Sequence, residues 1–311
     1  MSYTLLFPGQ GSQSVGMLKA LGDAHPQISQ TFDEASDALG FDLATLVREG
    51  PKDELDRTEN TQPALLAAGV AVWRAWQAQG VLPPLALAGH SLGEYTALVA
   101  AESIAFADAL KLVALRGRLM QAAVPEGQGG MVAVIGLDDE AVGKLCTAYP
   151  GRELLAPANY NAPGQVVVAG ETPALDWLTA NGKAHGARMV MRVGMSVPSH
   201  CSLLKSAADE LAVALAAIPI TAPKIPVLHN LDALPRHEPD AIRAALAAQL
   251  HQPVQWTRII QSLSAQGVNT WLECGPGKVL TGLVKRSVEG ATLVVLEDPT
   301  AFAASATHLK A

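Results

Sequence analysis

The sequence predicts an α/β protein with a large α/β-hydrolase-like domain, a parallel sheet core and an inserted ferredoxin-like small subdomain. Toward both ends of the chain, short apolar runs alternate with longer segments of helical periodicity, which is typical of a parallel sheet covered by helices. The middle has the order β-α-β-β-α-β, which is that of a ferredoxin-like unit. We therefore expect residues 1–124 and 198–311 to form the large catalytic domain and residues 125–197 the small subdomain.

The first part of the chain supplies the beginning of the large domain. Pro63 suits the first turn of its helix, where a missing amide proton costs little. The apolar pattern predicts strands at Tyr3–Phe7 and Leu85–Ala88, and helices at Gln27–Leu39, Pro63–Gln79, Leu92–Ala101 and about Ala107–Ala123.

The remaining elements follow in the same way. In the insert we expect strands at Met131–Ile135, Leu154–Ala158, Val166–Ala169 and Arg188–Val193, and helices at Asp138–Tyr149 and Pro173–His185. After it, the pattern predicts helices at Leu203–Ala217, Ala241–Leu250 and Trp256–Gln266, and strands at Val227–Asn230 and Thr270–Glu273.

Composition excludes several classes of protein. A net charge of -7 argues against a general nucleic-acid binder, which needs a dense basic face. Cys146, Cys201 and Cys274 are odd in number and show no paired spacing, so we expect neither disulfides nor a zinc site. The apolar stretches are too short to span a bilayer, and the first residues carry no basic leader. These features indicate a cytoplasmic protein that is not embedded in a membrane.

The strongest local signal is Gly89-His-Ser-Leu-Gly93, which lies between a predicted strand and a predicted helix. This G-x-S-x-G pattern forms a sharp turn that exposes the serine, and glycines are needed because the chain passes close to itself. The helix N-terminus directs amide protons toward an oxyanion, as acyl transfer requires. Ser91 is therefore the candidate nucleophile, and a glycine turn with an incidental serine is the alternative.

A serine hydroxyl needs a base, and the chain has eight histidines. Neighbouring side chains diverge at a sharp turn, so we interpret His90 as a packing or orienting residue. His200 lies where the insert returns to the large domain, a natural place for a loop over the active edge of the sheet. Spacing alone leaves the choice open. We expect Cys201 to be a small buried apolar residue and His25, His237 and His308 to be exposed.

Several motifs over nearly the whole chain carry a resemblance to a known family. They are Phe7-Pro-Gly-Gln-Gly-Ser-Gln13, Thr61-Gln-Pro63, Gly89-His-Ser-Leu-Gly-Glu94, Arg116-Gly117, Val197-Pro-Ser-His200, Gln249-Leu-His-Gln-Pro-Val-Gln-Trp256 and Glu273-Cys-Gly-Pro-Gly-Lys278. Together they resemble the malonyl-CoA:acyl carrier protein transacylases of bacterial fatty acid synthesis.

The resemblance implies a role for each matching residue. Ser91 would carry the acyl group, His200 would be the general base, and an amide carbonyl of Gln249 would steady the imidazole in place of an acid. The backbone amides of Gln10 and Leu92 would form the oxyanion hole. From the residues alone, a solvent-facing Gln249 and an ordinary glycine turn around Gln10 are the alternatives.

Arg116 bears on the choice of substrate. A malonyl group has a free carboxylate that costs several kcal/mol to bury unpaired, and a planar guanidinium is a bidentate partner for it. Arg116 and Met120 are four residues apart on one predicted helix, so both can face one pocket, whereas Arg118 points elsewhere. A solvated arginine is the alternative. We also expect Gln62, His90 and Ser199 to bind substrate. The residue types at Leu92 and Ser199 resemble those of dedicated malonyl enzymes.

These observations predict transfer of a malonyl group from malonyl-CoA to the phosphopantetheine thiol of an acyl carrier protein, by a ping-pong route and without metal or cofactor. The alternatives are a serine esterase or thioesterase, a non-enzymatic acyl-binding subunit, and a malonyl transferase that serves another carrier, such as that of a polyketide pathway. We expect a monomer. The acidic carrier would need a local basic face, for which the candidates are Lys183, Arg188, Lys278, Lys285 and Arg286.

Overall fold

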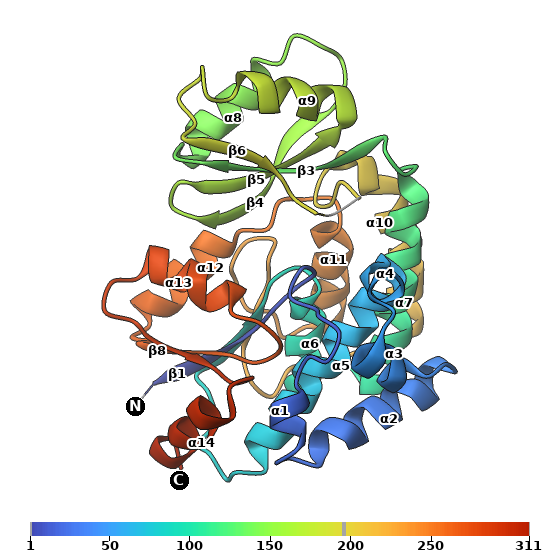
Figure 1. The fold of residues 1–311 in the computed structure, drawn as a ribbon, viewed down its shortest axis with the longest axis vertical. Helices are drawn as coiled ribbons and strands as arrows, with labels where there is room; N and C mark the ends of the chain where they lie inside the picture. The colour runs from blue at the N-terminus through green and yellow to red at the C-terminus, as the bar shows by residue number, and fades with distance from the viewer. Residues whose placement is uncertain (1, 195–196, 311) are drawn as a thin grey trace.

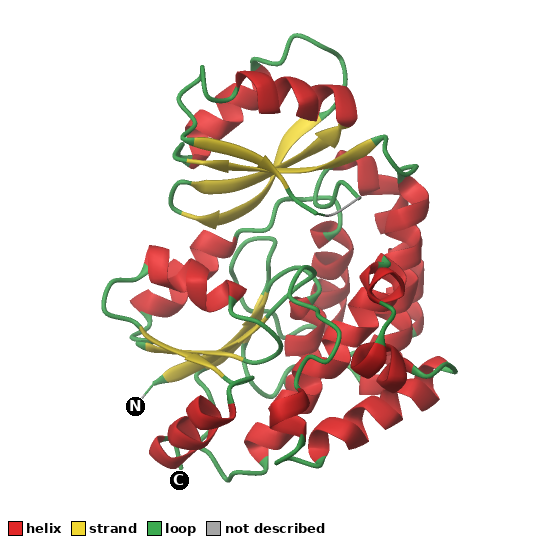
Figure 2. Cartoon of the chain, in the orientation of Figure 1, coloured by secondary structure: helices red, strands yellow, loops and turns green. Residues whose placement is uncertain are grey.

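Residues 2–194 and 197–310 are described in the computed structural model, which contains two separate sheets (Figure 1). Helices surround the larger sheet, and the smaller sheet lies at one end of the molecule with its own two helices on its outer face (Figure 2). The predicted α/β architecture with an inserted ferredoxin-like unit is confirmed. The predicted domain ranges include positions 1, 195–196 and 311, which lie outside the described residues.

The large sheet has the strand order β7-β2-β1-β8-β9, and every neighbouring pair is parallel. Its strands are β1 (Tyr3–Phe7), β2 (Ala86–Gly89), β7 (Val227–Leu228), β8 (Thr270–Glu273) and β9 (Thr292–Val295). Side chains alternate between its two faces. Leu5 and Leu87 belong to one buried cluster, whereas Leu6 and Ala88 belong to another on the opposite face. Both faces are therefore covered, as a parallel sheet requires.

Helices cover the two faces unequally. The larger cluster is formed by most of the helices. They are α1 (Lys19–Gly22), α2 (Gln27–Leu39), α3 (Leu43–Glu49), α4 (Lys52–Asp56), α5 (Thr58–Gln77), α6 (Gly93–Ala100), α7 (Phe106–Ala123), α10 (Lys205–Ala217), which follows the short 3₁₀ helix Ser202–Leu204, α11 (Pro239–Gln249) and α14 (Pro299–His308). The opposite face packs against α12 (Trp256–Ala265) and α13 (Val279–Ser287).

The small sheet is antiparallel, with the order β4-β5-β3-β6. Its elements are β3 (Gly129–Ile135), α8 (Asp139–Thr147), β4 (Leu155–Ala162), β5 (Gln165–Glu171), α9 (Thr172–Asn181) and β6 (Met189–Arg192). One face packs under α8 and α9, and the other contributes Met131 and Ala133 to a cluster with Cys201. The inner face of the small sheet therefore lies against the chain segment that carries His200.

The predicted start of one helix was wrong. Helix α5 begins at Thr58 rather than at Pro63, so Pro63 lies inside the helix and not in its first turn. Thr61 N donates to Arg57 O and completes an earlier turn, whose polar residues gave no apolar period. The helices α1, α3, α4, α13 and α14 and the strand β9 were also missed, because most are short or partly exposed.

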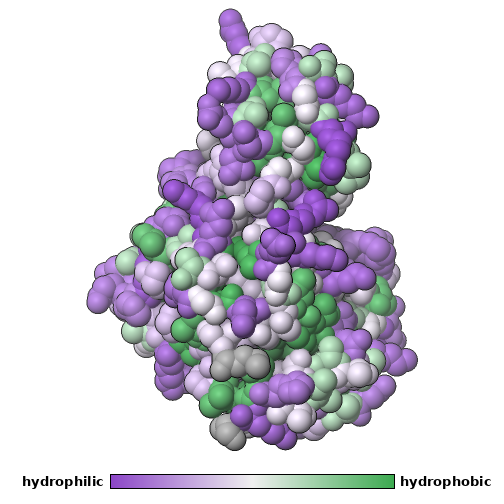
Figure 3. Space-filling model, turned by 90° about the vertical axis from the view of Figure 1, so that its left-hand side faces the viewer, coloured by the Kyte–Doolittle hydropathy of each residue, from purple (hydrophilic) through white to green (hydrophobic). Residues whose placement is uncertain are grey.

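The surface shows mixed polarity. In Figure 3 polar side chains are interspersed with smaller apolar areas on the visible face. Within residues 2–194 and 197–310, no helix has the length and apolar character to cross a bilayer.

All three cysteines are free and buried. Burial raises the pKa of Cys201 to about 11, so this thiol is protonated at neutral pH.

Candidate active site

Ser91 stands at a sharp turn between β2 and α6. Its φ of 52° lies in the left-handed region, which a residue with a side chain adopts at some cost. A β-carbon at Gly93 would lie 2.0 Å from Phe7 O, and one at Gly89 would lie 1.9 Å from Gly93 C. Both glycines are required because the turn passes directly against β1 and against itself.

His200 lies beside the serine. Its Nε2 is 2.8 Å from Ser91 Oγ, and its Nδ1 is 2.7 Å from the backbone oxygen of Gln249. Because a carbonyl oxygen can only accept, Nδ1 carries the proton and the lone pair of Nε2 faces the serine hydroxyl. The predicted amide carbonyl at Gln249 is thus the main-chain one.

The imidazole is buried and unprotonated. Burial is the main cause that lowers the pKa of His200 to about 3, and the positive charge of Arg116 lowers it further. The Gln249 carbonyl acts in the opposite direction but more weakly. His200 is therefore neutral at physiological pH, which is the state in which it can accept the proton of Ser91.

Arg116 places a buried cation in the same site. Its side chain is 1% exposed, and Nη2 lies 3.2 Å from Ser91 Oγ. It donates to the side-chain oxygens of Gln62 at 2.8 Å and Gln249 at 3.1 Å. No carboxylate within the described ranges forms an ion pair with it, and its Nε has no partner there. Burial lowers the pKa of Arg116. The site thus holds a desolvated guanidinium whose direct partners are neutral.

Gly117 explains how Arg116 reaches this position. A β-carbon at Gly117 would lie 2.7 Å from both Glu59 Cα and Thr58 O, so α7 contacts the backbone of α5 directly. This close approach places Arg116 next to Gln62, the residue before the internal Pro63. Gln62 in turn donates to Met120 Sδ at 3.3 Å.

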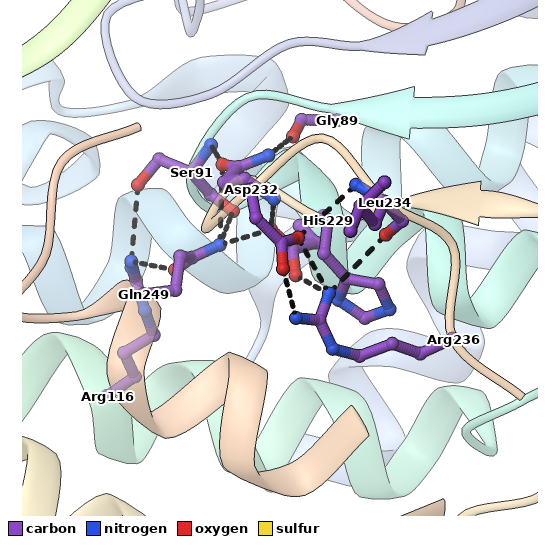
Figure 4. Close-up of polar contacts among 10 residues, drawn as sticks. Gly89, Ser91, Arg116, His229, Asp232, Leu234, Arg236 and Gln249 are labelled. Atoms are coloured by element: carbon purple, nitrogen blue, oxygen red, sulfur yellow. Dashed lines mark hydrogen bonds and ion pairs between the residues drawn. The ribbon is translucent and has the colours of Figure 1, made fainter. Parts of the chain in front are cut away.

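A buried polar network surrounds the turn, and Figure 4 shows Gly89, Ser91, His229 and Gln249 among its members. Glu94 is fully buried, and its carboxylate accepts from His229 Nδ1 at 2.7 Å, Asn230 N at 2.8 Å and Gln249 Nε2 at 2.9 Å. Asn230 binds both Ser91 N and Gly89 O. Sequence reasoning missed these roles of Glu94, His229 and Asn230. The available signal was a charged or polar side chain inside apolar segments.

A narrow pocket brings most of the predicted site residues together. The predicted site residues that line the pocket are Gln10, His90, Ser91, Leu92, Arg116, Met120, Ser199 and His200. Gln62 does not line it, since its side chain lies behind Arg116. The small sheet adds Met131 and Asn159, which sequence reasoning also missed, and Asn159 Oδ1 has no partner within the described ranges.

Backbone amide groups at the pocket remain available to a ligand. Neither Gln10 N nor Leu92 N donates a hydrogen bond within the part of the chain that the structure describes. Gly9 permits the contact between the two loops, because a β-carbon there would lie 2.6 Å from His90 O. Two unpaired donors next to a nucleophile can stabilise an oxyanion.

Of the other histidines, His90 also lines this pocket. His90 Nε2 is 2.8 Å from Asn161 Oδ1, and its ring packs edge-on against Trp256, in agreement with an orienting role. His237 and His308 are exposed as expected, but His25 is half-buried against Phe302. Within residues 2–194 and 197–310, no group of three or more His, Cys, Asp or Glu side chains could hold a metal ion.

A neutral imidazole on a serine hydroxyl, facing unpaired amides, supports nucleophilic attack on an acyl carbonyl, which is the chemistry of serine acyltransferases. The comparisons agree with this class. The family model described as the acyl transferase domain matches residues 4–305.

Individual relatives identify the family to which the chain belongs within this class. The malonyl CoA-acyl carrier protein transacylase of Salmonella typhimurium is 52% identical over 306 residues, covering 98% of this chain and 99% of that protein. The transacylase structure from Coxiella burnetii has a TM-score of 0.98 and 43% identity, covering 100% of this chain and 98% of that one. A malonyl-transacylase solved in complex with its type II polyketide acyl carrier protein has a TM-score of 0.97 and 48% identity, with 99% and 100% covered. This chain belongs to the malonyl CoA-acyl carrier protein transacylase family.

Proposed function

We propose that this protein transfers the malonyl group of malonyl-CoA to the phosphopantetheine thiol of an acyl carrier protein, through a malonyl ester on Ser91. One observation carries the proposal. A buried guanidinium without an acidic partner within the described residues stands 3.2 Å from the nucleophilic oxygen. In a malonyl ester, only a carbonyl carbon and a methylene separate the serine oxygen from the free carboxylate. That carboxylate is the anion that Arg116 lacks.

In the first half-reaction, Ser91 Oγ attacks the thioester carbonyl while its proton passes to His200 Nε2. The oxyanion of the tetrahedral intermediate is received by the amide groups of Gln10 and Leu92. The carbon–sulfur bond then breaks, and coenzyme A leaves as the thiol after taking the proton from His200. Malonyl-Ser91 remains, with its carboxylate on Arg116.

In the second half-reaction, the thiol of the carrier's prosthetic group enters and gives its proton to His200. The sulfur attacks the ester carbonyl, and a second tetrahedral intermediate uses the same amide groups. The carbon–oxygen bond breaks, and Ser91 Oγ regains a proton from His200. Overall the malonyl group passes from one thioester to another, so the proposed reaction needs no metal or cofactor.

Five exposed cations could contact a partner with a negative surface. Lys183, Arg188, Lys278, Lys285 and Arg286 are all exposed, and none forms an ion pair within the described residues. Arg188, in the small subdomain, and Arg286, on α13, line one surface hollow. We propose that this face receives the acidic carrier, and that the protein acts as a cytoplasmic monomer.

Labelling tests this function. Purified protein is mixed with malonyl-CoA, the modified residue is mapped by mass spectrometry, and an acyl carrier protein bearing its prosthetic group is then added. We expect label on Ser91, its transfer to the carrier thiol, and no label in Ser91→Ala. Release of free malonate at the same rate with and without the carrier would instead favour a thioesterase. Label on another residue would exclude the proposed intermediate.

A further inference from the structure

We propose that Asn230 and Glu94 are positioning residues for the transfer reaction. Together they fix the Ser91 turn and the Gln249 carbonyl, which orients His200, in one mutual arrangement. The inference rests on the proposed function of Ser91 and His200, and it assigns a task to the buried network described above.

Asn230 joins the two ends of the turn. Its Oδ1 accepts from Ser91 N at 2.7 Å, and its Nδ2 donates to Gly89 O at 2.7 Å. The two hydrogen bonds flank His90 and hold the left-handed backbone of Ser91, whose φ is 52°. Because Ser91 N is already occupied, the amide groups left for an oxyanion are those of Leu92 and Gln10. Asn230 therefore determines both where the nucleophile points and which amide groups stay free.

Glu94 connects this turn to the base. The same carboxylate oxygen, Oε2, accepts from Asn230 N at 2.8 Å and from Gln249 Nε2 at 2.9 Å. Gln249 Nε2 also donates to Ser91 O at 2.9 Å, and the backbone oxygen of Gln249 receives His200 Nδ1. One buried carboxyl group thus sets the relative position of nucleophile and base without touching either side chain.

The substitution Glu94→Gln separates the effect of the hydrogen bonds of Glu94 from the effect of its charge. In Glu94→Gln, the amide oxygen can accept from both Asn230 N and Gln249 Nε2. The new amide nitrogen can donate to His229 Nδ1 once His229 takes its other tautomer, and His229 Nε2 has no partner within the described residues that would oppose this. Glu94→Gln therefore preserves every contact, whereas Glu94→Ala removes all of them.

The test is the single-turnover rate of Ser91 malonylation, measured by quenching and mass spectrometry and normalised to folded protein. At saturating malonyl-CoA we expect Asn230→Ala and Glu94→Ala to slow acylation by about 10²-fold, the scale of a misplaced reacting group. KM for malonyl-CoA should change little, because these residues do not touch substrate. Glu94→Gln should retain most of the wild-type rate.

Glu273 offers a matched control. It is equally buried, and its carboxylate accepts from Leu280 N at 2.9 Å and Thr281 N at 2.8 Å at the start of α13, whereas its side chain forms no hydrogen bond to the turn or to Gln249. Glu273→Ala should lower thermal stability but leave the acylation rate of the folded protein unchanged.

Three results would overturn the inference: a wild-type rate in folded Asn230→Ala, an equal loss of rate in Glu273→Ala, or a loss in Glu94→Gln as large as in Glu94→Ala. If Asn230→Ala does not fold, Glu94→Gln decides, because a large loss there contradicts a purely positional role. Failure of the wild-type protein to become labelled would refute the proposed function instead.

Discussion

Removing the charge of Arg116 should separate malonyl from acetyl transfer. In Arg116→Ala the carboxylate of an arriving malonyl group finds no cation in a pocket where Arg116 is now 1% exposed. An acetyl group has no carboxylate and loses only packing. We therefore expect a large loss of malonyl loading and a small one of acetyl loading.

The magnitude follows from burial. Leaving one member of a buried ion pair without its partner costs about 3–5 kcal/mol. Since about 1.36 kcal/mol corresponds to a factor of ten in rate, kcat/KM for malonyl-CoA should fall about 10²–10⁴-fold. Arg116→Lys should fall between wild type and Arg116→Ala, because it keeps the charge and loses the planar fork.

The assay measures kcat/KM for malonyl-CoA and for acetyl-CoA with each variant. Arg118→Ala is the matched control, since Arg118 lies on the same helix but is exposed, and it should retain both activities. Equal losses of malonyl and acetyl transfer in Arg116→Ala would remove Arg116 from substrate selection and refute the reasoning.

Three further results are expected. Burial lowers the pKa of His200 from 6.5 to about 3, so the free energy of unfolding should fall as the pH drops from 6.5 toward 3. Urea unfolding of His200→Gln should show a weaker dependence of stability on pH. An identical dependence in the two proteins would contradict the burial of a neutral imidazole. Gly117→Ala should raise KM for malonyl-CoA and cost about 1–3 kcal/mol by separating α7 from α5, whereas Gly143→Ala in α8, where a β-carbon meets nothing, should not destabilise. Gln62→Glu supplies an internal anion to Arg116 and should weaken malonyl loading while sparing acetyl; unchanged kinetics would show that Arg116 does not require a free charge.

Local sequence signals predicted most of the fold. The strands Tyr3–Phe7 and Thr270–Glu273 were predicted with the bounds that the structure shows, because each is a short segment rich in strand-forming residues between breaks. The start of α5 was not predictable in this way. Its first turn is polar, and its place depends on the close contact with Gly117, which no local pattern reveals.

The site shows the same division. The Ser91 turn was readable because its glycines and their spacing are local requirements of the backbone. The network of Glu94 and Asn230 was not, because these residues are far apart in sequence and meet through the pairing of β2 with β7. A buried carboxylate in an apolar helix indicates that a partner exists, but it does not identify that partner.

The electrostatics of the pocket give a reason why His200 Nδ1 donates to a backbone carbonyl and not to a carboxylate. The residue that supplies the orienting carbonyl, Gln249, also places its side-chain oxygen 3.1 Å from Arg116 Nη2. A carboxylate at this position would neutralise Arg116 and take the place of the malonyl carboxylate. With a neutral amide there, the cation stays unpaired and helps to lower the pKa of His200. A bound malonyl carboxylate would remove that effect and make His200 a stronger base once the correct substrate is in place. A bound acetyl group has no carboxylate and would leave the effect of Arg116 on His200 unchanged. The preference for malonyl should therefore appear in kcat as well as in KM.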